Sequence, residues 1–184
     1  MYLYEHQSTY NPNIPLRDLF YIASEYQALA DGKSLYSSGI QKIPTPITPV
    51  RMDKENRHIT LAYFEQRSTV DYIGAVQGIP VCFDAKECSV DTFPLSNIHP
   101  HQVEFMNAFE QQGGIAFFLI FFSHADLFYY LPLRDLIIFW NRMKEGGRKS
   151  FRREELNNSY YLQKKNGFLI PYLDGIQTDL KLRD

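Results

Sequence analysis

The chain is poor in cysteine. Only two of its 184 residues are cysteines, Cys82 and Cys88. Both lie in one expected strand, and extended backbone advances about 3.3 Å per residue, so they are too far apart to form a disulfide. We interpret them as free thiols, buried or half-buried, in a reducing cytoplasm.

Long apolar segments are also missing. The longest uninterrupted apolar run, residues 115–122, has eight residues, whereas a membrane-spanning helix needs ~20. The first ten residues, MYLYEHQSTY, lack the basic region and apolar stretch of a secretory signal. We therefore expect no membrane association and a cytoplasmic location.

Positive charge is not in excess, because 19 Lys and Arg face 21 Asp and Glu for a net charge of −2. Nucleic-acid-binding proteins are usually basic overall, so the sum argues weakly against that class, although the distribution of charge matters more. The composition is 45% hydrophobic and 15% aromatic, which is typical of a folded protein. The length predicts a single domain over residues 1–184.

Apolar periodicity and turn residues predict both helices and strands. The expected elements are an irregular arm at residues 1–16, a helix at 18–30, a protruding β hairpin at 46–64, a hairpin of 70–76 and 79–88, a helix at 99–112, strands at 115–122 and 127–133, a helix at 133–144 and a basic loop at 146–153. Hairpin pairings outnumber strict βαβ units, so the fold class is mixed α+β or α/β.

Three triplets place an acid two residues before a lysine, at positions 31–33, 84–86 and 179–181. Only Asp84 and Lys86 lie in an expected hairpin. If Gln77 and Gly78 form a two-residue turn, Asp71 lies opposite Asp84, with Cβ atoms ~4.5–5.5 Å apart. Strand alternation puts Lys86 on the same face.

Two carboxylates this close repel unless a proton, a base or a cation lies between them. One interpretation is a Mg²⁺ site, in which Asp71 and Asp84 hold the metal and Lys86 orients the attacking water. The alternative is a solvated face of ion pairs. The hairpin alone leaves both open, since a slip of one residue moves Asp71 to the other face.

A second charged feature covers residues 141–153, where six basic residues and one acid give a net charge of +5. It predicts a patch that follows DNA phosphates, and the alternative is a solvated loop after a helix. His99 and His101 do not suggest a metal pair, because a helix N-terminus is a poor place for a cation.

Several strings together resemble the RecU family of Holliday-junction resolvases, which belongs to the PD-(D/E)xK nuclease group. The matching stretches are Ser68 to Gly74, Asp84 to Glu87, Phe93 to Leu95, His101-Gln102, Pro44-Thr45-Pro46, Ala62-Tyr63-Phe64, Phe139-Trp140, Gly147 to Ser150 and Leu173-Asp174. They occur in the family's order with similar gaps over residues 40–178.

The resemblance implies a restriction-endonuclease-like core, a central mixed sheet flanked by helices, and a β stalk at residues 46–64. It implies a cytoplasmic homodimer that cuts four-way DNA junctions symmetrically with Mg²⁺, or with Mn²⁺ in its place. Asp71 and Asp84 would hold the metal and Lys86 would serve the attacking water. Recombination or branch-migration proteins would be further partners.

The resemblance also implies DNA contacts and exposes departures. The DNA-binding positions would be Arg17, Lys54, Arg57, Gln102, Arg148 and Lys149. The family usually has Glu where this chain has Asp84. Its first-helix Glu falls on Ile22, so Glu25, one turn later, is the candidate third metal ligand. The stalk carries a net charge of only +1.

These departures leave two alternatives to a junction-resolving endonuclease. One is a junction-binding homologue with weak or lost cleavage. The other is a nuclease of the same fold that acts on other DNA.

Overall fold

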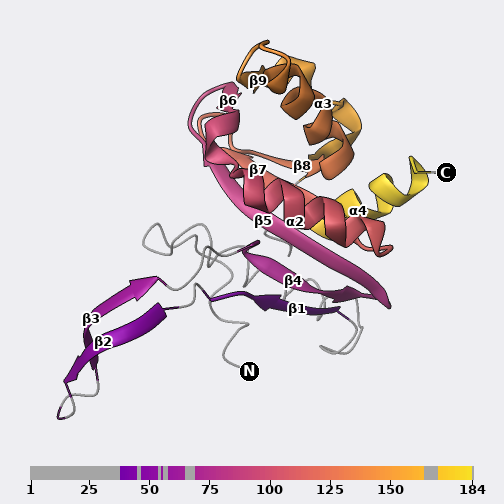
Figure 1. The fold of residues 1–184 in the computed structure, drawn as a ribbon. Coiled ribbons are helices and arrows are strands. Elements are labelled where there is room, and N and C mark those ends of the chain that lie inside the picture. The colour runs from indigo at the N-terminus through magenta and orange to yellow at the C-terminus, as the bar shows by residue number, and fades with distance from the viewer. Residues whose placement is uncertain are drawn as a thin grey trace.

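The computed structural model describes residues 38–44, 47–53, 55, 58–64, 69–163 and 170–183. Its centre is a six-stranded sheet in the order β1-β4-β5-β7-β8-β10 (Figure 1). β5 and β7 run parallel and the other neighbouring pairs run antiparallel, which confirms the mixed fold class. The strands are β1 Ser38–Lys42, β4 Tyr72–Val76, β5 Ile79–Cys88, β7 Ile115–Phe122, β8 Leu127–Pro132 and β10 Tyr161–Leu162.

The β4–β5 hairpin has the predicted register. Gln77 and Gly78 have φ angles of 52° and 86°. Positive φ at both central residues is the geometry of a type I′ turn, which matches the right-handed twist of paired strands. Tyr72 pairs with Phe83, so extending the ladder by one residue sets Asp71 opposite Asp84.

Helices cover both faces of the sheet (Figure 1). Helix α2 (Pro100–Gln111) connects β6 and β7, and α3 (Leu133–Lys144) packs on β7, β8 and α2. Gln102 of α2 contacts Asp84, whereas Tyr172 of α4 (Tyr172–Lys181) packs against Phe83, with 5.6 Å between ring centroids. Because successive strand residues point to opposite faces, α2 and α4 lie on opposite sides of the sheet.

A row of aromatic rings fixes the alignment of four central strands. The ring centroids of Tyr72 and Phe83 are 4.6 Å apart, those of Phe83 and Phe117 4.9 Å, and those of Phe117 and Tyr130 4.3 Å. Stacked rings at these distances contribute roughly 0.5–1.5 kcal/mol per pair beyond their buried area. Gly175 of α4 lies directly over this row, because a Cβ there would be 2.5 Å from the Tyr130 ring.

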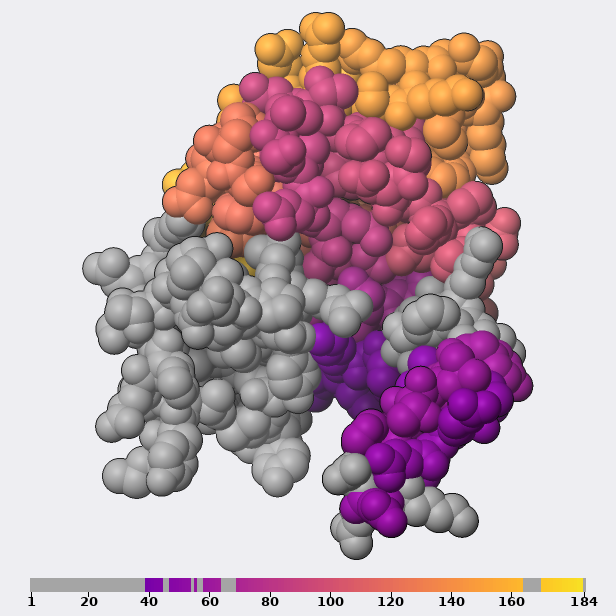
Figure 2. All heavy atoms as spheres, turned by 90° about the vertical axis from the view of Figure 1, so that its left-hand side faces the viewer, coloured from indigo at the N-terminus to yellow at the C-terminus, as the bar shows by residue number. Residues whose placement is uncertain are grey.

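The second sheet is a two-stranded hairpin that extends away from the body of the molecule (Figures 1 and 2). It consists of β2 (Ile47–Asp53) and β3 (His58–Phe64), within the residues where the sequence predicts a protruding hairpin. Most of its described side chains are exposed although several are apolar: Met52 is 54% exposed and Leu61 is 51% exposed. The hairpin therefore offers apolar surface to solvent.

The predicted loop at residues 146–153 is wrong in its second half. β9 (Ser150–Arg152) pairs with β6 (Thr92–Pro94) in a third, small sheet. The cause is one apolar residue among many charges: Phe151 is fully buried and stacks on Phe93, with 5.1 Å between centroids. Short 3-10 turns complete the region: η2 (Leu95–Asn97), η3 (Arg153–Glu155) and η4 (Asn158–Tyr160).

The C-terminal helix is fixed by a buried carboxylate, which belongs to the third of the acid-x-Lys triplets. Asp179 has no exposed surface. It pairs with Arg134 of α3 and with Arg183, whose Nη2 lies 3.0 Å away, and it accepts a hydrogen bond of 3.1 Å from Tyr130. These partners join α4 to α3 and β8.

The arm at residues 1–16 and the helix at 18–30 lie outside the described residues, as do Arg17, Glu25, Lys54 and Arg57. Both cysteines are buried and free. Among the described residues, no helix combines the length and the apolar character needed to cross a membrane.

Candidate active site

Asp84 is the centre of the candidate site. It lies in the middle of β5, and its side chain is buried on the face covered by α2. Asp71 stands just before β4, where its backbone carbonyl accepts a hydrogen bond of 2.8 Å from the Ile43 amide. That bond ties the chain at Asp71 to the residue that follows β1. The Asp71 and Asp84 side chains interact with each other where the β4–β5 ladder ends.

Lys86 and Asp84 form an ion pair. The Lys86 Nζ atom lies 2.7 Å from Oδ1 of Asp84, and the lysine side chain is 18% exposed. Two residues along a strand is the spacing that places side chains on one face, so this contact follows from the acid-x-Lys pattern. The predicted convergence of Asp84 and Lys86 is present.

Gln102 contacts the other carboxylate oxygen, to which its Nε2 donates a hydrogen bond. The amide orientation is fixed because its Oε1 accepts a hydrogen bond of 3.1 Å from the backbone N–H of His99, the residue that caps α2. This is a capping box, a local arrangement that satisfies a free N–H at a helix start. The start of α2 thus orients the Asp84 side chain.

The surroundings of Asp84 favour its neutral form. Burial raises the pKa of its carboxyl from 3.8 to about 7, the ammonium of Lys86 works in the opposite direction, and the carboxylate of Asp71 adds to the rise. A charged group whose environment disfavours its charge is common at catalytic and binding sites.

The oxygen atoms of Asp71 and Asp84 suit a hard divalent cation such as Mg²⁺, which typically takes one or two carboxylates and keeps several waters. Within the described part of the chain, three or more Asp, Glu, His or Cys do not gather at one point. Glu25, the candidate third ligand, lies outside that part. The two carboxylates by themselves fit a hydrated Mg²⁺ ion.

In the basic region at residues 141–153, two arginine side chains bind the carboxylate of Glu155. Arg148 donates from Nη1 to Oε2 of Glu155 at 2.9 Å, and Arg142 donates to Oε1 at 2.5 Å. Sequence reasoning missed Glu155 because it lies beyond the counted stretch. The available signal was the spacing of Arg152 and Glu155, since the Arg152 N–H donates to Glu155 at 2.7 Å as the residue before a 3-10 turn.

Lys149 is held in the basic region by its backbone, because its carbonyl accepts a hydrogen bond of 3.0 Å from the Leu95 N–H. Its side chain contributes no ion pair or hydrogen bond within the described residues. The predicted DNA contacts Arg148 and Lys149 therefore lie next to each other, directly before β9. The Arg148 side chain is paired with Glu155, and the Lys149 side chain is not paired with an acid within the described residues.

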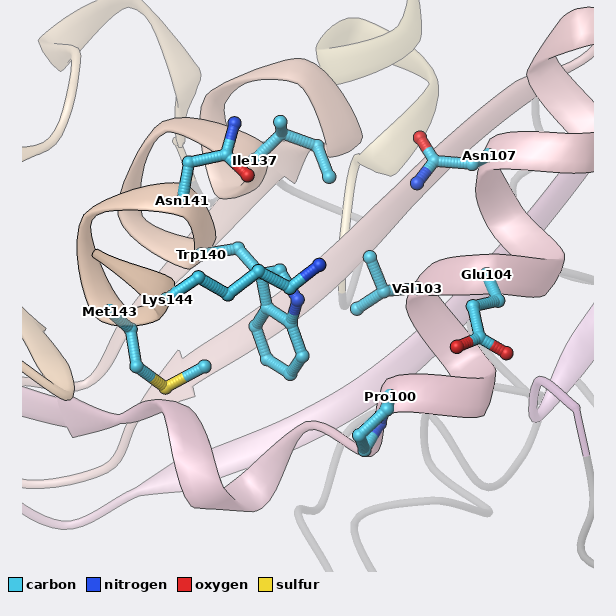
Figure 3. Close-up of a pocket in the computed structure, with 9 residues that line it drawn as sticks. All are labelled: Pro100, Val103, Glu104, Asn107, Ile137, Trp140, Asn141, Met143 and Lys144. Atoms are coloured by element: carbon cyan, nitrogen blue, oxygen red, sulfur yellow. The ribbon is translucent and has the colours of Figure 1, made fainter. Parts of the chain in front are cut away.

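A cavity of about 400 Å³ lies between α2 and α3 (Figure 3). Val103, Glu104 and Asn107 line it from α2, and Trp140 and Lys144 line it from α3. Figure 3 shows the Lys144 side chain extending along this cavity beside Trp140. Lys144, which the sequence places in the basic patch, thus belongs to the α2–α3 cleft.

The rings of His99 and His101 stack on each other with 5.3 Å between their centroids. Both are at the start of α2 and neither joins the acids of the candidate site in a metal-ligating group within the described residues.

Comparison with known proteins adds an independent observation. The sequence profile of the family described as Recombination protein U matches residues 33–178. A protein named Holliday junction resolvase RecU from Limosilactobacillus reuteri is 39% identical over 142 residues, which cover 74% of this chain and 70% of the relative. Proteins of the same name from Bacillus pumilus and Staphylococcus aureus are 45% and 43% identical, and the matches cover 61% and 62% of their lengths.

Proposed function

Because this chain belongs to the Recombination protein U family, we propose that it is a structure-specific endonuclease that resolves four-way DNA junctions in recombination and repair. One observation in the chain carries the proposal: buried Asp84 is joined by Lys86, Gln102 and Asp71 at one end of the β4–β5 hairpin. This set contains carboxylates that can hold a metal ion and an ammonium that can stabilise developing negative charge.

Each residue has a distinct part in the proposed reaction. Asp71 and Asp84 would hold Mg²⁺, which when bound would supply an acidified water and neutralise charge on the phosphoryl group. The ammonium of Lys86 stabilises negative charge that develops in the transition state and orients the attacking water. Gln102 keeps the Asp84 carboxylate in one rotamer through its hydrogen bond.

Asp84 is one methylene shorter than the Glu that the family usually has here. A carboxylate on a shorter side chain stays closer to the strand, so a metal ion would sit differently from one held by Glu. Lys86 at 2.7 Å and the Gln102 amide reach Asp84 at this shorter length, so the site remains connected. This supports a cleaving enzyme over a homologue that only binds junctions.

The β2–β3 hairpin is the proposed stalk, which enters the open centre of the junction. Its low positive charge argues against gripping phosphates, which is a contact made by basic side chains. Exposed apolar residues such as Val50, Met52 and Leu61, at 58%, 54% and 51%, offer instead a surface for the flat faces of bases at the branch point.

Two symmetric cuts need two active sites, so the enzyme acts as a homodimer. Its substrate, branched chromosomal DNA, places it in the cytoplasm, in agreement with two free cysteines. Mn²⁺ can replace Mg²⁺ as a hard cation with oxygen ligands. Recombination and branch-migration proteins that act on the same junctions are the expected partners.

The test uses a labelled four-way junction, a flap and a linear duplex, each with Mg²⁺, Mn²⁺ or EDTA. We expect paired nicks at symmetric positions of the junction only, and none in EDTA. Asp71→Asn and Lys86→Ala should each lower the cleavage rate by at least about 100-fold, since removing a group that stabilises transition-state charge typically costs about 10²–10³.

The results separate the candidates. Junction binding without nicks under either metal would refute the endonuclease and identify a binding homologue. Equal cleavage of flap and duplex would identify a nuclease for other DNA. Unchanged cleavage by both variants would mean that the activity resides elsewhere in the chain.

A further inference from the structure

The carboxylate of Glu155 is the centre of a cluster on the β9–η3 segment. It accepts from Arg142 at 2.5 Å, from Arg148 at 2.9 Å and from the backbone N–H of Arg152 at 2.7 Å. The two guanidinium groups come from different elements, since Arg142 lies in the last turn of α3 and Arg148 lies in the connection to β9. One carboxylate therefore holds two arginines that the chain alone would leave independent.

Arg142 is the fixed end of this cluster. A second N–H group donates to the Ser150 carbonyl at 2.7 Å, and the guanidinium lies over the Phe139 ring, 5.2 Å from its centroid. Gly147 lets the turn after α3 lie close to the Arg142 backbone, because a Cβ there would be 2.8 Å from the Arg142 carbonyl oxygen. Arg142 thus has both terminal NH2 groups and one face of its guanidinium plane engaged within the protein.

Arg148 is the open end. Its one hydrogen bond among the described residues uses Nη1, and 40% of its side chain is exposed. A guanidinium carries five N–H donors in a planar fork that matches phosphate oxygens. The donors that Glu155 does not use remain available to a ligand.

The Glu155 carboxylate is well suited to hold the two guanidinium groups. Hydrogen bonds from Arg142, from the Arg152 N–H and from Arg148 lower the pKa of Glu155 from 4.5 to about 2. Glu155 therefore stays ionised near neutral pH, and its negative charge holds the two arginines.

We propose that Glu155 is a positioning residue, anchored by Arg142, that holds the Arg148 guanidinium in the orientation that binds a phosphate of the DNA substrate. The inference rests on the proposed function and adds to it a residue for which neither the family resemblance nor the charge pattern gave a role. Preorganisation lowers the conformational entropy that a long side chain loses when it binds.

The sign of one substitution separates this role from simple electrostatics. Replacing an acid near DNA with a neutral residue should strengthen binding, because it removes repulsion from phosphates. Positioning predicts the reverse for Glu155→Gln, since the amide keeps the shape and one acceptor but loses the charge that holds both arginines.

The experiment measures the dissociation constant of a labelled four-way junction in EDTA at several salt concentrations. Arg148→Ala should weaken binding about tenfold and reduce the salt slope by about one, as expected for one lost phosphate contact. Glu155→Gln should weaken binding about three- to tenfold. The double variant should be no weaker than Arg148→Ala, because residues acting as a unit are non-additive.

Two further variants serve as controls. Lys149 lies next to the cluster, but its side chain has no partner in it. The loss of affinity caused by Lys149→Ala should therefore multiply with the loss caused by Glu155→Gln. Arg148→Lys leaves Glu155 and Arg142 untouched and keeps the charge. It should still lose most of the Arg148 contribution, because a lysine lacks the planar fork. In cleavage assays with Mg²⁺, Glu155→Gln should raise KM and leave kcat unchanged.

Several outcomes would overturn the inference. They are tighter or equal binding by Glu155→Gln, multiplicative losses in the Arg148→Ala double variant, and wild-type affinity of Arg148→Lys. A fall in kcat with no change in KM would place Glu155 in general structural support instead. A chain that binds no junction at all would refute the proposed function itself, which the unmodified protein reveals before any variant is made.

Discussion

Asp84→Asn should stabilise the metal-free protein, and the gain should depend on pH. Asp84 is buried, and its pKa rises from 3.8 in an ordinary environment to about 7 in the fold. An asparagine has nearly the same shape and carries no charge, so it imitates the protonated carboxyl. The substitution therefore removes the cost of keeping a buried charge beside Asp71.

The sign follows from where the proton is bound. Between pH 4 and 7 the folded protein retains a proton that the unfolded chain has released, so the free energy of unfolding of the metal-free parent falls as pH rises through this window. The free energy of unfolding of the Asn variant should not fall in this way, because asparagine does not titrate. Each pKa unit is worth about 1.4 kcal/mol, so the variant should exceed the parent by about 4 kcal/mol at pH 8 and by less than about 2 kcal/mol at pH 5.

Urea denaturation in EDTA at both pH values gives these differences. Glu104→Gln, an exposed acid on α2, is the matched control and should show a difference near zero at both. Adding Mg²⁺ at pH 8 at about 100 times its dissociation constant should raise the parent by about 2.7 kcal/mol and the Asn variant by much less. A stability difference that is equal at pH 5 and pH 8 would refute the argument that burial destabilises the Asp84 charge.

Three further predictions concern single contacts. Gln102→Leu should raise the Mg²⁺ concentration needed for half-maximal cleavage about 10- to 100-fold, because partners of metal ligands have effects of that size; an unchanged Mg²⁺ titration would contradict this role. Gly74→Ala should destabilise the protein by about 3 kcal/mol or more in urea denaturation, because the new Cβ would be 1.8 Å from the Gly39 carbonyl oxygen. Gly39→Ala is the control and should be nearly neutral, because its Cβ would have nothing within 4 Å. Equal effects of the two substitutions would show that β1 is free to shift. Asp179→Asn should cost about 1–3 kcal/mol in thermal or urea unfolding, because the buried acceptor of Tyr130 and of the partly exposed Arg134 and Arg183 loses its charge. Exposed Lys181→Ala should change little, and a negligible loss for Asp179→Asn would mean that the network adds little to stability.

The sequence predicted the local parts of the fold well. Gln77-Gly78 permits positive φ at two successive positions, and this turn chemistry fixed the β4–β5 register to the residue. The eight apolar residues of β7 and the amphipathic pattern of α3 gave those elements within one residue. Such features depend on neighbours along the chain, which a sequence shows directly.

Elements held by distant partners were harder to predict. β9 has three residues, and its pairing with β6 depends on Phe151 stacking on Phe93 across nearly sixty positions. β1 was not predicted as a strand, and it pairs with β4 only because Gly74 lets the backbones approach. No local propensity distinguishes such short segments from loops.

The candidate site divides in the same way. The sequence alone placed Asp84 and Lys86 on one face and set Asp71 opposite, because strand alternation and a two-residue turn are local geometry. Only the tertiary structure decided that Asp84 is fully buried, that Gln102 of α2 holds it, and that Glu155 pairs the arginines that looked like an open basic patch. Burial and long-range pairing depend on which surfaces the packed layers bring together, and the order of residues along the chain does not show this.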